Sequence, residues 1–338
     1  MVNTMPRARA NEPAKIYILH ENDAWTAPLL AALRELGAPH ETWHLDRGFF
    51  DLAAPPPAGV FYNRVSPSSH TRGHRYAPEY TACVLAWLEA HGRRVVNGSA
   101  AFALELSKTA QYAALTRHGL AVPHSLPAVG REEILAAARR LGAPFITKHN
   151  RAGKGLGVHL FRSLEALAAY LDGPAFEESV DGVTLVQRYI EAPEPFITRV
   201  EFIGGRFFYA VRVDTSEGFE LCPADACQVG DTLCPTGDGA HGDSSPAKPP
   251  KFQILARFES PLVARYGRFM AAHGIEIAGF ELITDKAGNA YTYDVNMNTN
   301  YNAEAEAAAG RFGMKALAAH LAETLARSRA GAEASAAA

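Results

Sequence analysis

The first hundred residues alternate between short apolar runs and longer stretches in which apolar positions recur at helical spacing. Residues 15–19 form an apolar run that predicts a buried strand, and a polar turn follows at residues 20–23. Further strands and amphipathic helices are expected in the order 25–36 (helix), 41–45, 59–62 (strands), 78–91 (helix) and 94–96 (strand). This alternation predicts a small parallel sheet with helices on its faces, which binds ligands beyond the carboxyl ends of its strands.

After residue 97 the pattern becomes one of mixed helices and shorter strands. Ser99 is placed to cap a helix that runs to about His118, and a second helix is expected at 131–141. Ser163 is placed to cap a later helix. Strands are expected at 144–148, 158–161 and 184–187.

The last third contains four expected strands and two helices. The strands at 196–202 and 206–213 are separated by Gly204-Gly205, which is typical of a hairpin. Residues 222–250 are rich in Pro, Gly, Asp and Ser, which predicts a long surface loop. The remaining expected elements are a helix at 256–273, strands at 276–284 and 290–295, and a final helix at 313–327.

The length of 338 residues suits several packed subdomains better than one hydrophobic core. Both ends are predicted to be disordered tails, because residues 1–14 are polar and contain Pro6 and Pro13, and residues 328–338 have no bulky side chain to bury. The predicted division is a tail at 1–14, an N-terminal subdomain at 15–98, a central subdomain at 99–190, a C-terminal subdomain at 191–327 and a tail at 328–338.

Composition excludes several classes of function. Apolar residues make up 48% and charged residues 20% of the chain, and the formal net charge is −3. This balance gives no bulk attraction for nucleic acid or an anionic membrane, and no apolar run is long enough to cross a bilayer. Four cysteines do not make a disulfide scaffold, so a cytoplasmic protein with reduced thiols is expected.

A glycine-rich loop between two predicted strands is the first sign of chemistry. Arg151-Ala-Gly-Lys-Gly-Leu-Gly157 places glycines at 153, 155 and 157, where backbone N–H groups can approach an anion closely. The loop is neither a P-loop nor a dinucleotide fingerprint, because a strand and not a helix follows it. We interpret it as a flap over phosphates, with Arg151, Gly153, Lys154, Gly155 and Gly157 as ligand-binding residues; the alternative is a flexible hairpin with a basic tip.

Two lysines are candidate partners for the phosphates. Lys148 ends the strand just before the glycine loop, where a compact positive charge can contact α and β phosphates. Lys108 lies inside the predicted helix that starts at Ser99. For Lys108 the alternative is a solvated helix face, which is the usual environment of a lysine.

Three oxygen donors form a candidate metal site. Asp294 and Asn296 are two apart on one strand and so share a face, while Val295 points away. Glu281 sits in an otherwise apolar run on a strand that should pair with theirs. Such a set suits Mg²⁺, with Mn²⁺ as an alternative; the competing interpretation is a sheet face exposed to water.

Two strand arginines can clamp a carboxylate or phosphate through parallel hydrogen bonds. They are Arg199 and Arg212, on the two strands of the predicted hairpin. The alternative for both is an ion pair with Glu201 or Asp214 on the same strands.

In this order, these residues and motifs resemble those of the ATP-grasp superfamily, and of the RimK-type (glutathione synthetase ATP-binding domain-like) carboxylate–amine ligases in particular. The resemblance covers about residues 95–325: Asn97-Gly98, Lys108, Lys148 with the flap, Leu185 to Glu191, Arg199, Arg212, Glu281 and Tyr293 to Asn296. It implies an α/β (α+β) ATP-grasp fold, in which a βαβ subdomain precedes two α+β subdomains that enclose the ATP cleft. The segment 185–191 is then the hinge that holds adenine, through Gln187, Tyr189 and Ile190.

The resemblance also implies an activity. Such enzymes use ATP and Mg²⁺ to activate a carboxylate as an acyl phosphate and join it to an amine. Arg212 would stabilise the oxyanion and Arg199 would clamp a substrate carboxylate. The substrate is expected to be a small molecule, such as an amino acid, or a peptide, and self-association into a homo-oligomer is frequent in the family. Two rival functions are a small-molecule kinase of the same fold and a non-catalytic, regulatory ATP-binding module.

The chain departs from the family pattern at two places. Ser107 stands where an acid often precedes the first lysine, and Ile197 stands where an Asp often precedes the first strand arginine. The acid that binds the ribose is therefore open between Glu191 and Glu194.

The acceptor site is expected between the first subdomain and the catalytic one. Polar residues that follow predicted strand ends are the candidates: Arg64, Ser68, Arg72, Asn298 and Asn300. Each has an alternative role as a loop residue that bonds its own backbone. Cys222, Cys227 and Cys234 lack the paired spacing of a zinc site and would need a fourth ligand such as His241, so plain loop cysteines are favoured.

Overall fold

The computed structural model describes residues 13–153, 155, 157–216 and 250–336, which form three sheets. The first sheet is parallel with the order β2-β1-β3-β4. Its strands are β1 (Lys15–His20), β2 (His40–His44), β3 (Gly59–Asn63) and β4 (Arg94–Val96). The helices α1 (Asp23–Glu35), η1 (Ser69–Arg72) and α2 (Ala77–Ala90) connect them.

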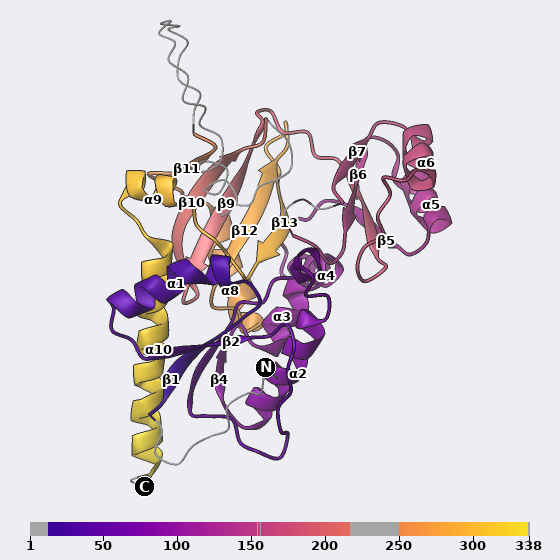
Figure 1. Cartoon of the computed structure of the whole chain (residues 1–338). Coiled ribbons are helices and arrows are strands. Elements are labelled where there is room, and N and C mark those ends of the chain that lie inside the picture. The colour runs from indigo at the N-terminus through magenta and orange to yellow at the C-terminus, as the bar shows by residue number, and fades with distance from the viewer. Residues whose placement is uncertain (1–12, 154, 156, 217–249, 337–338) are drawn as a thin grey trace, which may run out of the picture.

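The first sheet is covered on one face by the end of the chain. Helix α10 (Gly313–Ala336) packs beside α1 against this sheet, and Leu317 and Leu321 are fully buried against Ile16 and Val60. Figure 1 shows α10 running along the sheet on the side opposite to α2. The first sheet is thus covered by a segment that the sequence analysis placed in the C-terminal subdomain.

The central sheet has the order β5-β8-β6-β7 and is antiparallel. Its strands are β5 (Ser125–Ala128), β6 (Phe145–His149), β7 (His159–Phe161) and β8 (Thr184–Arg188). Helices α5 (Arg131–Leu141) and α6 (Leu164–Asp172) bury Ile134 and Leu167 against Phe145 and Val186. They lie on the outer side of this sheet (Figure 1), so its other face is left for the cleft.

The third sheet is antiparallel with the order β11-β10-β9-β12-β13. Its strands are β9 (Phe196–Ile203), β10 (Arg206–Asp214), β11 (Phe252–Ile254), β12 (Ala278–Thr284) and β13 (Ala290–Asn296). Helices α3 (Ser99–Glu105), α4 (Lys108–Arg117) and α8 (Pro261–Ala272) form a core with the sheet through residues such as Tyr112, Phe202 and Phe269. Helix α9 (Ala303–Ala309) packs near β11.

Asn97 connects the first sheet to the third. Its amide group donates to the backbone carbonyls of Ile277 and Met297 at 2.9 and 3.1 Å, and its Oδ1 accepts from the N–H groups of Glu276 and Ile277. The residue is buried and has φ of 54°, a left-handed conformation that Asn tolerates better than most residues.

The structure corrects three expectations about the helices. The helix predicted from Ser99 to His118 is two helices, because Ser107 breaks it: its hydroxyl accepts from the N–H of Ala110 and caps α4, whereas Gly98 precedes α3 without a side-chain cap. The helix predicted at 256–273 begins only at Pro261. The final helix continues to Ala336, into the predicted tail, because alanine favours helix and extending a helix is easier than starting one.

Candidate functional site

Elements of all three sheets and their connections line a cleft of about 490 Å³. Its walls come from the loop after β3, from α3 and α4, from β6 and the glycine loop, from the segment after β8, and from β9, β12 and β13. Polar residues of all three sheets line it. The predicted site residues that line it are Ser68, Lys108, Lys148, Gly153, Gly155, Gln187, Tyr189, Ile190, Glu191, Glu194, Arg199, Glu281, Asp294, Asn296, Asn298 and Asn300.

The three predicted metal ligands lie together on one sheet face. Glu281 of β12 and Asp294 of β13 are direct cross-strand partners, and a β-bulge follows Glu281. The amide nitrogen of Asn296 donates to Oε1 of Glu281 at 3.1 Å, which leaves the Asn296 carbonyl oxygen as a donor for a cation. Val295 points into the core with 1% exposure, as the alternation of the strand predicts.

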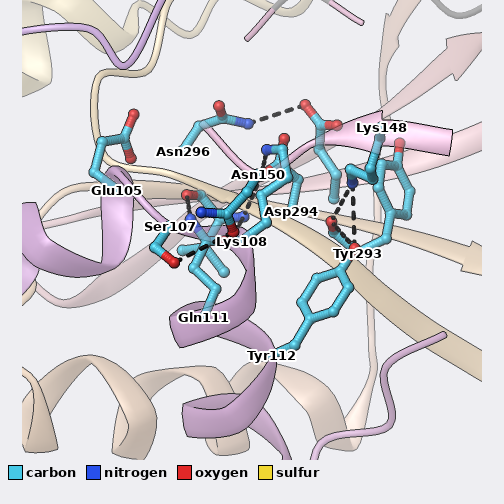
Figure 2. Close-up of polar contacts among 12 residues, drawn as sticks. Glu105, Ser107, Lys108, Gln111, Tyr112, Lys148, Asn150, Tyr293, Asp294 and Asn296 are labelled. Atoms are coloured by element: carbon cyan, nitrogen blue, oxygen red, sulfur yellow. Dashed lines mark hydrogen bonds and ion pairs between the residues drawn. The ribbon is translucent and has the colours of Figure 1, made fainter. Parts of the chain in front are cut away.

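Lys108 is the first residue of α4 and reaches into this acidic group. Its Nζ lies 2.7 Å from Oδ1 of Asp294, and the two side chains are only 10% and 16% exposed. Figure 2 shows both side chains between α4 and β13. The helix break at Ser107 creates this position, since it starts a new helix turn at the edge of the cleft.

Lys148 is buried with neutral hydrogen-bond partners. Its Nζ donates to the hydroxyl of Tyr112 and to the backbone carbonyl of Tyr293, both at 3.2 Å, and it lies over both rings (Figure 2). Burial, and then the charge of Lys108, lower the pKa of Lys148 to about 7. Two ammonium groups next to one cleft favour an anion with several negative charges.

The pKa values of the carboxyl groups in this cluster are shifted in different directions. Burial raises the pKa of Glu281, although Arg199 opposes the shift. Burial also tends to raise the pKa of Asp294, but the ammonium groups of Lys108 and Lys148 outweigh it and lower that pKa. Asp294 is therefore the most firmly ionised of the acids that could hold a metal ion.

The glycine loop between β6 and β7 borders the cleft through Gly153 and Gly155. Gly157 has φ of 69°, and a Cβ there would stand 2.3 Å from the ring of His149. Only glycine fits beside that ring, so the sequence pattern at this point has a steric reason. Lys154 lies outside the described residues.

Arg151 faces away from the cleft toward the first subdomain. Its guanidinium bonds both carboxylate oxygens of Glu79 on α2, at 2.8 and 3.2 Å, and Arg75 shares that carboxylate. The bond to Arg151, though opposed by burial, lowers the pKa of Glu79 to about 2. In this conformation the arginine joins the base of the loop to α2.

The segment after β8 forms the apolar end of the cleft. Tyr189 and Ile190 line it together with Ile146 and Ile283, which makes a slot that suits a flat ring. The Gln187 side chain accepts from Tyr112 at 2.8 Å. Glu191 and Glu194 both line the cleft and form exposed ion pairs, with Lys286 and with Arg212.

The two strand arginines occupy different environments. Arg199 is 6% exposed and bonds Glu201, Glu281 and Thr299 at the cleft wall. Arg212 is exposed, pairs with Glu194 at 2.8 Å and stacks on Phe196. The ion pair with Glu201, which was the alternative to a clamp, is thus present for Arg199, whereas Arg212 pairs with Glu194.

The predicted acceptor residues gather around the opposite end of the cleft. Ser68, Asn298 and Asn300 line it, and Arg64 lies behind them with 2% exposure. Arg64 donates to Oδ1 of Asn300 at 2.6 Å and to the backbone carbonyl of Trp25.

Arg72 is held at the side of this end. It bonds both oxygens of Glu21, at 2.7 and 3.1 Å, and stacks on Trp25, which lines the cleft. Arg72 therefore contacts a residue of the cleft wall and does not line the cleft itself.

Sequence reasoning missed several residues of the cleft wall, of which Glu105 and Trp25 matter most. Glu105 ends α3 and accepts the N–H of Met297 at 2.7 Å; burial raises its pKa to about 7. Figure 2 places it on the α3 side of Asn296. Neither residue belongs to a local sequence motif. Each reaches the cleft only through the packing of elements that are distant in the sequence.

Comparison with known proteins identifies the fold. No protein-family model matches the chain. Among solved structures, a RimK-domain ATP-grasp protein from Sphaerobacter thermophilus superposes with a TM-score of 0.59 at 18% identity, over 92% of this chain and 99% of that one. The ATP-grasp ligase PsnB, complexed with a minimal precursor, gives 0.61 at 17% identity over 92% and 99%. D-alanyl-alanine synthetase A from Vibrio cholerae gives 0.62 at 12% identity over 94% and 100%.

Two curated proteins match parts of the sequence. A D-alanine–D-alanine ligase from Chromohalobacter salexigens is 27% identical over 124 residues, which are 36% of this chain and 37% of that protein. The large chain of carbamoyl phosphate synthase from Pyrobaculum aerophilum is 37% identical over 105 residues, 31% of this chain and 10% of that protein. The chain thus spans about a third and about a tenth of these two relatives.

The chain has the ATP-grasp fold, as the sequence resemblance predicted. None of the described helices is both long and apolar enough to cross a membrane.

Proposed function

We propose that this protein is an ATP- and Mg²⁺-dependent ligase that forms an amide bond between a carboxylate and an amine. The carboxylate takes the γ-phosphoryl group of ATP to give an acyl phosphate, and the amine then displaces phosphate. ATP, acid and amine give amide, ADP and phosphate. The observation that carries the proposal is the buried ammonium of Lys148 beside the Glu281–Asp294–Asn296 face in one cleft.

The donor set fits Mg²⁺. Glu281, Asp294 and the carbonyl oxygen of Asn296 are hard oxygen ligands, and Mg²⁺ is usually held by one or two carboxylates together with phosphates and water. When bound, the ion supplies positive charge beside phosphate oxygens. Lys108 now neutralises Asp294, so we infer that it exchanges this partner for a phosphate when metal and nucleotide enter.

The cleft also fits a nucleotide along its length. Tyr189, Ile190 and Ile283 make an apolar slot, and Lys148, the glycine loop and the metal ligands line the same cleft. We assign the triphosphate to the two lysines and the loop, and the ribose to Glu191 or Glu194. A closed loop would also keep water from the acyl phosphate.

Arg199 is our first candidate for contacting the reacting carboxylate, because Glu201 and Thr299 fix its guanidinium at the cleft wall. Arg212 is the candidate for stabilising the oxyanion that forms when the amine attacks. That role requires its exposed ion pair with Glu194 to open, which is inexpensive for a surface pair.

We place the substrates at the end lined by Trp25, Ser68, Asn298 and Asn300. Arg64 acts there as a positioning residue, since it holds the Asn300 side chain from behind the wall. The PsnB and D-alanyl-alanine synthetase structures support an amino acid or a peptide as the substrate class.

The test is a screen of ADP release with pairs of amino acids and short peptides and with Mg²⁺, followed by the product mass. The proposal predicts a product lighter than its two substrates by one water. A product heavier than one substrate by a phosphoryl group would show a kinase, and ATP binding without ADP from any pair would favour a binding module.

Single variants then test the assignment of the site. We expect Lys148→Ala and Asp294→Ala to lower ADP release by at least about 100-fold. Lys315→Ala is the matched control, because Lys315 forms an exposed ion pair with Glu35 far from the cleft. Near-normal turnover by a folded Lys148 or Asp294 variant would contradict the assignment.

A further inference from the structure

Two histidines stand side by side at the carboxyl edge of the first sheet. His20 ends β1 and His44 ends β2, and the two residues are Cα partners in the parallel register. Side chains of paired residues on neighbouring strands lie on the same face of the sheet. The rings therefore meet, with centroids 5.2 Å apart and planes at 84°.

A carboxylate joins them from the start of α1. Asp23 is the first residue of that helix, and Asn22 fixes the turn by accepting from the N–H of Trp25 at 3.0 Å. Oδ1 of Asp23 lies 3.8 Å from Nδ1 of His20, and the Asp23 side chain is 87% exposed, so it can move closer. One donor atom from each of His20, Asp23 and His44 lies within 4.8 Å of the other two.

His20 has an unused ligand atom in this group. The residue is 3% exposed, and its Nδ1 makes no hydrogen bond to any residue that the structure describes. Buried polar atoms nearly always bond to protein, water or an ion, so we expect this nitrogen to have a partner of one of these kinds. It faces the carboxylate of Asp23.

His44 has the second partner that metal-binding imidazoles usually have. Its Nδ1 donates to Oδ1 of Asp46 at 2.9 Å, which fixes the tautomer and leaves the lone pair on Nε2. A ligating histidine generally donates its other ring N–H to a carboxylate or carbonyl in this way. Asp46 is thus a positioning residue and not a ligand.

We propose that His20, His44 and Asp23 form a binding site for a divalent transition-metal ion, with Zn²⁺ as the best-suited one. Two imidazoles on a tetrahedral zinc at about 2.1 Å have ring centroids about 5 Å apart, and any two ligand atoms are about 3.4 Å apart. The observed distances of 5.2 and 3.8 Å need only small side-chain movements to meet this geometry. Nitrogen ligands favour zinc over Mg²⁺ or Ca²⁺, and three protein ligands leave a position open to water.

This site is separate from the Mg²⁺ ligands of the proposed function and does not depend on it. None of the three residues lines the cleft. Glu21, the neighbour of His20, holds Arg72 against Trp25, so the metal would bind next to the substrate end of the cleft wall.

The test is a zinc titration of the tag-free, full-length chain against a chromophoric chelator, with Mg²⁺ in excess to occupy the cleft. We expect one equivalent of zinc to bind and to raise the melting temperature. Asp23→Asn and His44→Gln should each lower the affinity by more than about 100-fold, and Asp46→Asn by about 10- to 100-fold. His124→Gln, at an exposed histidine elsewhere, is the matched control and should leave the affinity unchanged.

Because the Asp23 side chain is exposed, Asp23→Asn should not disturb the core. A loss of zinc affinity in this variant therefore reports on the site and not on folding. Co²⁺ in place of zinc should give weak visible bands without the intense absorption of a thiolate ligand. Absence of stoichiometric binding, or binding that survives Asp23→Asn and His44→Gln, would overturn the proposal. Binding that is lost instead in a Cys222→Ser, Cys227→Ser, Cys234→Ser variant would also overturn it.

Discussion

The ammonium of Lys108 lies 2.7 Å from the carboxylate of Asp294, at the point where α4 meets β13. Both side chains are largely buried, so each charge compensates the other while no ligand is bound. We interpret this pair as the resting arrangement of a site in which the lysine turns to phosphate and the aspartate to metal.

The Lys108–Asp294 pair should contribute more to the free energy of unfolding than a surface ion pair does. We predict that Lys108→Met and Asp294→Asn each lower the free energy of unfolding by about 3 kcal/mol, because each leaves a buried charge without its partner. The double variant should lose clearly less than the sum of the two, by about 2 kcal/mol. Urea denaturation of all four proteins measures this coupling, and strict additivity would show that the contact does not matter energetically.

Lys148 should take up a proton when ATP binds. Its pKa is lowered to about 7 from 10.5, so at about pH 8 it is mostly neutral without ligand, and a triphosphate should restore its charge. Calorimetric ATP binding in buffers of different ionisation enthalpy should show this uptake. Lys148→Arg, which stays charged, should abolish it, and equal uptake by that variant would contradict the assignment.

The lowered pKa of Lys148 also predicts how the stability of the protein depends on pH. Between about pH 7 and 10.5 the unfolded chain binds more protons at Lys148 than the folded chain does. This group therefore makes the ligand-free protein more stable as the pH rises through that window. In Lys148→Met the unfolding free energy should lack this contribution, which denaturation at several pH values can measure.

Asn97 should be critical for joining the first and third sheets. Asn97→Ala should cost about 3 kcal/mol or more, because it removes buried hydrogen bonds to Ile277 and Met297 and puts alanine at φ of 54°. Asn97→Gly loses the same bonds but tolerates the backbone, so it should be less damaging by about 1 kcal/mol. Equal losses in thermal unfolding would mean that the backbone conformation is not strained by alanine.

The glycine loop can be tested with two glycine variants. Gly157→Ala places a methyl group against the His149 ring, whereas Gly182→Ala has similar positive φ but open space around it. We predict that both lose about 1 kcal/mol from the backbone, and that only Gly157→Ala also weakens ATP binding. Unchanged affinity in Gly157→Ala would show that the loop does not contact the nucleotide.

Much of the site could be predicted because its residues belong to local patterns. The pairing of Glu281 with Asp294 follows from two strands joined by a short turn, and Val295 marks the opposite face. Lys148 could be found because it lies near the end of a strand next to a glycine loop. The side chains at these positions follow directly from the two-residue period of a strand.

Other features of the fold and the site depend on contacts between segments that are distant in the sequence, and no local sequence pattern indicates these contacts. Glu105 reaches the cleft only because α3 packs beside the end of β13. Helix α10 packs on the first sheet, nearly the whole chain away, and β11 is only three residues long. The break before Lys108 had a signal, Ser107 as a cap, but the apolar pattern continued across it.

The account is tested most directly by a structure of the protein with Mg²⁺ and a non-hydrolysable ATP analogue. We predict a metal ion at about 2.1 Å from oxygens of Glu281, Asp294 and Asn296, with the phosphates contacting Lys108 and Lys148. The bond between Lys108 and Asp294 should then be broken. A nucleotide bound elsewhere, or a metal held by none of the three residues, would contradict the account.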